Sequence, residues 1–236
     1  MEKKFQTDSG KQLVIANGEN SALNYISAKR RGGFAEMIDR ASEMAQFIQG
    51  PKALGSSRRT AGIHEAGHAV MAQVTVGRLF PYPHRVRVFQ ETGLAAEVGE
   101  VWLGCVDNPP DAPDFVIDPN DVAGMHTHAL RTLAGIVAEQ LFAPDDFRLG
   151  SSLDEQVAGL LAAGNIAHTL GLEHMNVFNG LVKQTGDILS HNKSPLLHIA
   201  RWMDKHPKLT GRRLSVMLEG VALPASVSNL GFWGGK

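Results

Sequence analysis

The sequence predicts a mainly α-helical fold with a small β-hairpin or sheet, an α+β arrangement. Three observations favour it. Apolar residues recur at helical spacing in several long stretches after residue 57. Strand-like alternation of apolar and polar residues is confined to short stretches, the clearest at Arg85–Phe89. The 236 residues are 43% hydrophobic and 20% charged, which is enough apolar material for one sizeable core.

We expect three regions along the chain. Residues 1–56 read as an N-terminal extension with a short strand at 11–16 and an amphipathic helix at 34–48, which Gly50-Pro51 ends. A basic run at 29–31 within it is typical of a solvated loop. Residues 57–222 should form the main domain. Residues 223–236 are rich in glycine and predict a flexible tail.

Residues 57–76 predict the first helix of the main domain. The stretch has no proline, Ser56 or Ser57 could cap it, and its apolar residues recur at helical spacing, so one flank should be buried. Two strands should follow at 85–89 and 95–103, joined through the turn signal Glu91-Thr92-Gly93. Further helices are expected at about 118–142, 153–170, 177–189, 195–205 and 211–218.

The first of these helices contains the motif His64-Glu65-Ala66-Gly67-His68. Residues four apart lie on one face of an α-helix, so both imidazoles could bind one tetrahedral metal ion, most often zinc. Glu65 lies about 100° round the helix from His64 and could accept a proton from water at an open metal position. The alternative is that His64 and His68 are ordinary helix histidines beside a surface glutamate.

A metal centre of this kind needs a third protein ligand. Asp154 lies in the first turn of an expected helix, where backbone N–H groups favour a carboxylate. It could be a metal ligand, or it could simply stabilise that helix end, and spacing does not choose between the two. The other candidates are histidines that are more typical of surface or interhelix positions: His126, His128, His168, His174, His191, His198 and His206.

Several segments, in this order, resemble the peptidase domain of the FtsH family of ATP-dependent zinc metalloproteases. Thr60–Met71 resembles the metal-binding helix of that family, and 133–140 its next long helix. The segment 150–158 resembles the one that supplies its third zinc ligand, an aspartate. Residues 191–214 are similar to its closing helices. The resemblance covers roughly residues 57–220, although Leu149, Leu153 and Ile136 depart from the pattern of the family.

The resemblance implies a helical, zincin-like metallopeptidase domain. It implies Zn²⁺ held by His64, His68 and Asp154, with Glu65 as the catalytic base, and hydrolysis of peptide bonds in peptides or unfolded proteins. It also implies a homo-oligomeric ring or a separate ATPase partner, because no G-x-x-x-x-G-K-[ST] phosphate loop occurs in the sequence. The alternative function is a non-catalytic zinc-binding scaffold or interaction module derived from the peptidase fold.

Composition disfavours several other classes. The formal net charge of −1 gives no global attraction for nucleic acid, and no apolar run is long enough to span a membrane. The first residues lack the apolar region of a signal peptide. Cys105 is the single cysteine, so no intrachain disulfide can form. We therefore expect a cytoplasmic protein without nucleic-acid partners or a membrane span.

Overall fold

The fold is described from a computed structural model of the chain. The described residues are 3–6, 12–15, 36, 43, 56–75, 83–90, 101–109, 121–148 and 152–227. The strand expected at 11–16 is confirmed by β2 (Gln12–Ile15), which pairs antiparallel with β1 (Lys3–Gln6). The helix expected at 34–48 lies outside the described residues apart from Glu36 and Glu43, which are both helical. The expected tail lies largely outside them too.

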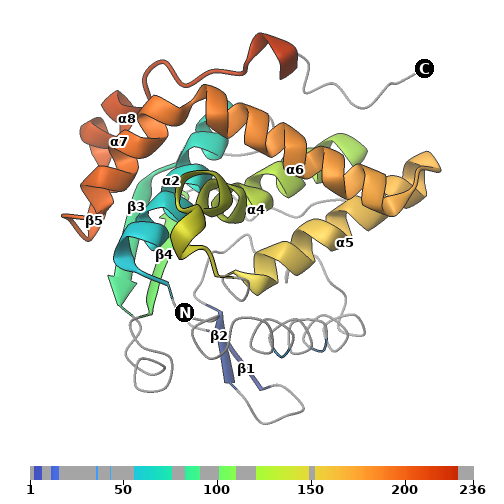
Figure 1. The fold of residues 1–236 in the computed structure, drawn as a ribbon, viewed down its shortest axis with the longest axis horizontal. Coiled ribbons are helices and arrows are strands. Elements are labelled where there is room, and N and C mark those ends of the chain that lie inside the picture. Colours follow the sequence, from blue (N-terminus) through green and yellow to red (C-terminus); the bar gives the residue numbers. More distant parts are fainter. Residues whose placement is uncertain are drawn as a thin grey trace.

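Six α-helices, two short 3₁₀ turns and a three-stranded sheet are the remaining elements of the described structure (Figure 1). Helices α5 and α8 have the bounds that the sequence predicts, and the other helices differ from prediction by a few residues at their ends. The helices are α2 (Arg58–Val74), α4 (Val122–Phe142), α5 (Leu153–Leu170), α6 (His174–His191), α7 (Lys193–Met203) and α8 (Gly211–Leu218). The strands of the sheet are β3 (Arg85–Gln90), β4 (Trp102–Asp107) and β5 (Lys208–Thr210).

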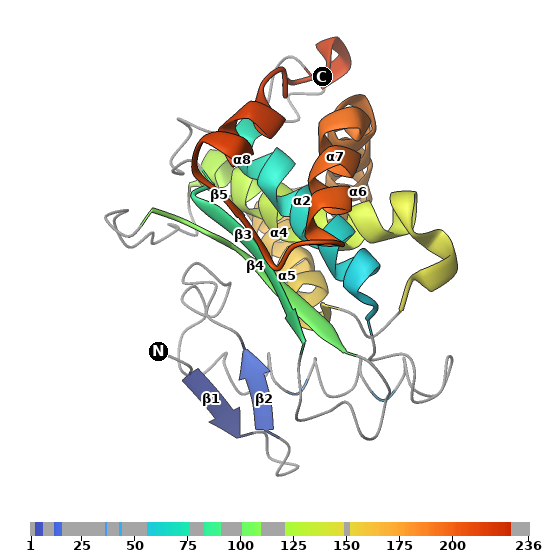
Figure 2. The same ribbon diagram turned by 90° about the vertical axis from the view of Figure 1, so that its left-hand side faces the viewer.

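Helix α2 occupies the centre of the molecule. It packs against α4 and α7 on its helical side and against β3 and β4 on the other, so the sheet covers one face of the helical layer (Figure 2). The Ser57 side chain caps its N-terminus by accepting a hydrogen bond from the Thr60 amide. Nearly all of its residues from Thr60 to Ala72 are buried, so any polar side chain in that stretch needs a partner inside the protein.

Helices α2 and α4 approach closely because α2 has a glycine where they cross. A Cβ atom at Gly67 would lie 2.5 Å from the carbonyl oxygen of Ala134 and 2.7 Å from Cβ of Ala138. Both distances are shorter than van der Waals contact. Alanines on the facing side of α4 complete the small-residue contact. The histidine-bearing face of α2 is thereby held directly against α4.

The sheet has the strand order β4-β3-β5 with antiparallel pairing throughout. The pairing of β3 with β4 confirms the predicted hairpin. Of its second strand, expected at 95–103, residues 95–100 lie outside the described residues, and β4 continues beyond the expected end to Asp107. It pairs residue by residue with β3, from Gln90 opposite Trp102 to Arg85 opposite Asp107. Strand β5 was not predicted, since three residues carry too little alternation to be recognised. Among the described residues, no helix has the length and apolar character needed to cross a bilayer.

The close crossing of α2 and α4 gives a first prediction. Replacing Gly67 with Ala should lower the free energy of unfolding by about 1–3 kcal/mol, since the added methyl group overpacks the crossing and outweighs the better helix propensity of alanine. Urea unfolding followed by circular dichroism measures the change. Gly186→Ala is the matched control, because a Cβ there meets nothing nearer than 3.8 Å. Equal stability of the two variants would contradict the prediction.

Candidate metal centre

Helix α2 brings the two histidines of the motif together, as the four-residue spacing predicts. Their Nε2 atoms lie 3.0 Å apart, and the two rings meet edge to face with centroids 4.7 Å apart. His64 is buried and His68 is nearly so. The two nitrogens therefore converge on one point inside the protein. Glu65, which the alternative interpretation takes as a surface residue, is buried.

Helix α4 fixes the orientation of both imidazoles from behind. His64 Nδ1 lies 2.7 Å from Oε1 of the buried Glu139, and His68 Nδ1 lies 2.8 Å from the backbone carbonyl oxygen of Arg131. A carbonyl oxygen can only accept, so Nδ1 of His68 is the donor in that bond. With Nδ1 protonated, the lone pair of a neutral ring is on Nε2, the atom that faces the shared point. Outer partners of this kind are what orient metal-bound histidines in proteins.

The N-terminal turn of α5 supplies a carboxylate to the same point. Glu155 Oε1 lies 3.0 Å from His68 Nε2, and Glu155 Oε2 lies 3.3 Å from His64 Nε2. Among the described residues, His64, His68 and Glu155 form a group whose ligand atoms are close enough together to hold one metal ion. Two imidazole nitrogens and one carboxylate oxygen would leave a fourth tetrahedral position open.

The charges of this group support one another. Burial would lower the pKa of His64 and His68, but the facing Glu155 carboxylate overcomes this and raises both, with Glu139 adding to the effect on His64. Burial would likewise raise the pKa of Glu155, yet the two imidazoles hold it below its ordinary value. Glu155 is therefore ionised at neutral pH. A metal cation in the group would take the place of the protons that the histidines share with it.

The predicted third ligand, Asp154, is not in this group. The structure places it one position earlier in the same helical turn, partly buried, with its pKa raised by burial to about 6. Its role as a metal ligand stays a prediction, whereas the adjacent Glu155 makes the contacts described above. Neighbouring helix positions differ by about 100°, so which of the two faces α2 depends on how α5 is rotated when it docks.

Two residues that precede α5 in the chain, Asp146 and Ser152, contact α2. Asp146 accepts hydrogen bonds from the side chains of Ser57, at 2.6 Å, and Thr60, and so ties the short 3₁₀ turn at 144–146 to the start of α2. Ser152 then adopts a left-handed conformation with φ of 50°, and α5 begins at the next residue. The Ser152 hydroxyl oxygen lies 3.5 Å from both ring nitrogens of His64. These contacts bring the first turn of α5 to the histidines.

Glu65 lies beside the group, between α2 and β4. Only 4% of its surface is exposed, and Oε2 has no hydrogen-bond partner among the described residues. Burial raises its pKa to about 7, although the two nearby histidines act in the opposite sense. Gly104 on β4 faces this side chain, and a Cβ there would overlap its Cγ and Cδ atoms. Glu65 is thus a buried carboxyl group that can both take up and release a proton near neutral pH.

Gly135 on α4 lies directly against the two imidazoles. A Cβ at this position would overlap His64 Nε2 and lie 2.5 Å from His68 Nε2. The two ring nitrogens therefore pack directly against the Gly135 backbone, where only a glycine leaves room for them. Ring nitrogens held by outer partners, with a carboxylate facing them, form a donor set that fits a zinc-type cation, for which nitrogen ligands are common. Calcium and magnesium prefer all-oxygen sites.

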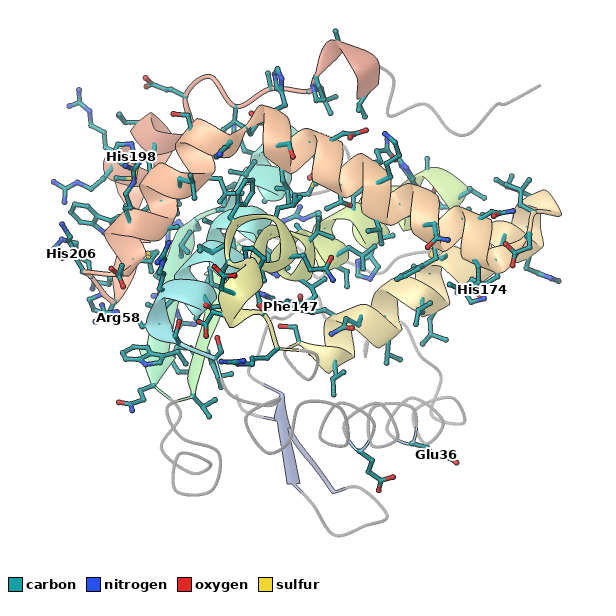
Figure 3. The ribbon with its side chains drawn as sticks, viewed as in Figure 1. Glu36, Arg58, Phe147, His174, His198 and His206 are labelled. Carbon is teal, nitrogen blue, oxygen red and sulfur yellow. The ribbon has the colours of Figure 1, made fainter. Side chains whose placement is uncertain are left out.

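The remaining histidine candidates lie elsewhere. His126 Nε2 is 2.7 Å from Oε1 of Gln184, and the exposed His174 Nε2 donates to the carbonyl oxygen of Leu160 at 2.8 Å. His128 is buried, and burial with the nearby Arg131 lowers its pKa to about 4. Figure 3 labels His174 at the α5–α6 side and His198 and His206 at the opposite, α7 side of the molecule. None of these, nor His168 and His191, belongs to the group on α2.

The neighbouring carboxylates Asp154 and Glu155 give a second prediction. Glu155→Gln should weaken zinc binding by more than about 100-fold, because it removes an ionised ligand, whereas Asp154→Asn should weaken it by less than about tenfold. Isothermal titration calorimetry with zinc measures both affinities. The two substitutions are isosteric and one residue apart, so each controls for the other. The reverse order of effects would assign the third ligand to Asp154.

The close packing of the imidazoles on Gly135 gives a third prediction. Gly135→Ala should abolish stoichiometric zinc binding, because the methyl group would collide with both Nε2 atoms and displace the two rings. Metal analysis after dialysis against excess zinc checks this, with Gly186→Ala as the matched helix-glycine control. If Gly135→Ala still retains one zinc ion per chain, the zinc site lies elsewhere in the protein.

Comparison with known proteins adds no family to this description. No protein-family model matches the chain, and no curated protein matches it. The FtsH-like resemblance stays a prediction from sequence motifs. The site itself is defined by contacts among three elements: α2, which carries both histidines, α4, which orients them, and α5, which adds Glu155.

Proposed function

We propose that this chain is a zinc-dependent endopeptidase that hydrolyses peptide bonds in peptides or unfolded proteins. The observation that supports it most is the buried Glu65 beside the His64, His68 and Glu155 group. A buried carboxyl oxygen without a partner costs about 1–3 kcal/mol, and a purely structural metal site has no use for one. A hydrolytic site does, because it needs a base next to the open metal position.

The chemistry that zinc supplies when bound is Lewis-acid polarisation of the substrate carbonyl and a lowered pKa for water beside it. His64, His68 and Glu155 would hold the ion, while Glu139 and the Arg131 carbonyl keep the imidazoles in place. Glu65 takes one proton from the attacking water as the oxygen forms its bond to the carbonyl carbon. Glu65 then gives that proton to the amine nitrogen as the C–N bond breaks. Burial raises the pKa of Glu65, which strengthens its carboxylate as the base for the first transfer.

The sheet offers a place for the substrate chain. Strand β4 is an edge strand of the described sheet, and Gly104 on it lies against Glu65. Its start is bridged by Ser56 at Val101, but the described residues form no further ladder on that side of β4. An extended peptide pairing there through its backbone would pass the base with little dependence on side-chain identity. Peptides, flexible tails and unfolded chains are therefore the substrates proposed, and a ring assembly or a separate ATPase remains a further proposal.

The base gives the fourth prediction. Glu65→Gln should lower the rate of cleavage of a labelled unfolded protein by about 10²–10⁴-fold, because proton transfer is lost while the metal ligands are kept. Zinc content, measured on the same preparation, should stay at the wild-type value. Cleavage by the wild type should need no ATP, and a chelator should stop it. Glu219→Gln, at an exposed position after α8, is the control for loss of one carboxylate.

The outcomes separate the proposed enzyme from the zinc-binding scaffold. Zinc bound at one ion per chain, with no cleavage by the wild type or with cleavage unaffected by Glu65→Gln, would leave a non-catalytic metal site. Cleavage that persists in the chelator would exclude the metal mechanism.

A further inference from the structure

A second feature of the chain is the concentration of positive charge near its C-terminal end. Six of its 23 lysine and arginine residues, but one of its 24 acidic residues, lie between Lys193 and Leu218. This stretch carries a formal charge of +5 within a chain of net charge −1, so the remainder carries −6. It folds as α7, β5 and α8, on the side of the molecule that Figure 3 marks with His198 and His206.

The cations gather around two adjoining hollows on this side, which we call the basic surface. One hollow of about 460 Å³ is lined mainly by α7 and the residues after it, and a second of about 520 Å³ by α7 and α8, with His198 shared by both. The side chains that define the basic surface are His198, Arg201, Lys205, His206, Arg212 and Arg213, all exposed. Within the described part of the chain, no carboxylate forms an ion pair with the four lysines and arginines among them.

Two of the arginines are held in position before any partner binds. Arg213 Cζ lies 4.2 Å from the centroid of the Trp202 ring. The His206 ring stacks on the Trp202 ring, with the two ring centroids 3.9 Å apart. The Trp202 indole N–H in turn donates to the Lys208 carbonyl oxygen at 3.1 Å. Arg201 donates from Nε to the carbonyl oxygen of Leu197 at 3.0 Å. A guanidinium fixed in this way loses little entropy when its remaining N–H groups bind an anionic oxygen.

We propose that the basic surface binds an acidic polypeptide segment, whose carboxylates pair with Arg201 and Arg213 across the two hollows. Charge complementarity supports an anionic partner, and planar guanidinium groups suit the bidentate geometry of carboxylates. The aromatic ring of this surface is already stacked with Arg213 and His206, so it does not offer the free platform on which single-stranded nucleic acids stack. Val216 is the single large apolar side chain exposed on α8, which is too little apolar area for a membrane-binding helix.

Binding of a fluorescent oligoglutamate peptide to the full chain, followed by anisotropy, tests the proposal. The wild type should bind it, should bind a glutamine peptide of equal length at least about tenfold more weakly, and should lose affinity as salt is raised. Arg213→Gln and Arg201→Gln should each weaken binding about tenfold, the value of one charge-assisted hydrogen bond. Arg213→Lys should also weaken it, because the charge stays but the stacked planar fork is lost.

Lys183→Gln is the matched control, since it removes one exposed cation from α6, where the ammonium group pairs with Asp187 at 2.6 Å. It should leave binding unchanged. Equal weakening by Lys183→Gln and Arg213→Gln would mean that only overall charge is sensed, which overturns the proposal. Tighter binding of an oligothymidylate with the same number of charges would also overturn it, in favour of nucleic acid. Circular dichroism confirms that each variant is folded, and the zinc-dependent activity is not needed for any of these measurements.

Discussion

The close crossing of α2 and α4 is the constraint on which the metal centre depends. Gly67 lets the two helices approach until backbone and Cβ atoms of α4 touch α2, and Gly135 leaves room for the two imidazole rings against the α4 backbone. At this separation Glu139 and the Arg131 carbonyl oxygen reach the Nδ1 atoms directly. A larger residue at either glycine would separate the helices by the thickness of a side chain, and the hydrogen bonds that orient the imidazoles would be lost.

Four titratable side chains gather beside this crossing: His64 and Glu65, which are buried, and His68 and Glu155, which are partly buried. Burial opposes the charged form of each one, yet Glu155 and the two histidines stabilise one another's charges. Glu65 is the exception, because its raised pKa reflects desolvation that the histidines offset only in part. The site therefore contains one carboxylate that is held ionised and one that titrates near neutrality. Two carboxyl groups with different pKa values can take different roles, one as a metal ligand and the other in proton transfer.

The metal group and the basic surface lie in different parts of the structure. The metal group lies inside, between α2, α4 and α5. The basic surface belongs to α7, β5 and α8, of which α7 packs against α2. Because β5 and β4 both pair with β3, the two regions are joined through one small sheet. A partner on the basic surface and a chain along β4 would thus be held by the same rigid element.

The sequence by itself determined the helices and the histidine pair. Helical spacing of apolar residues is a local property, so α5 and α8 were placed at their bounds, and the four-residue spacing of His64 and His68 was enough to bring their rings together. The tertiary structure decided the rest. Strand β5 and the extension of β4 to Asp107 depend on pairing with β3. Whether Glu155 points at the histidines depends on how α5 is rotated when it packs. The hydrogen bond between Glu139 and His64 depends on how closely α4 approaches α2. Both contacts join residues far apart in the chain, which only packing brings together.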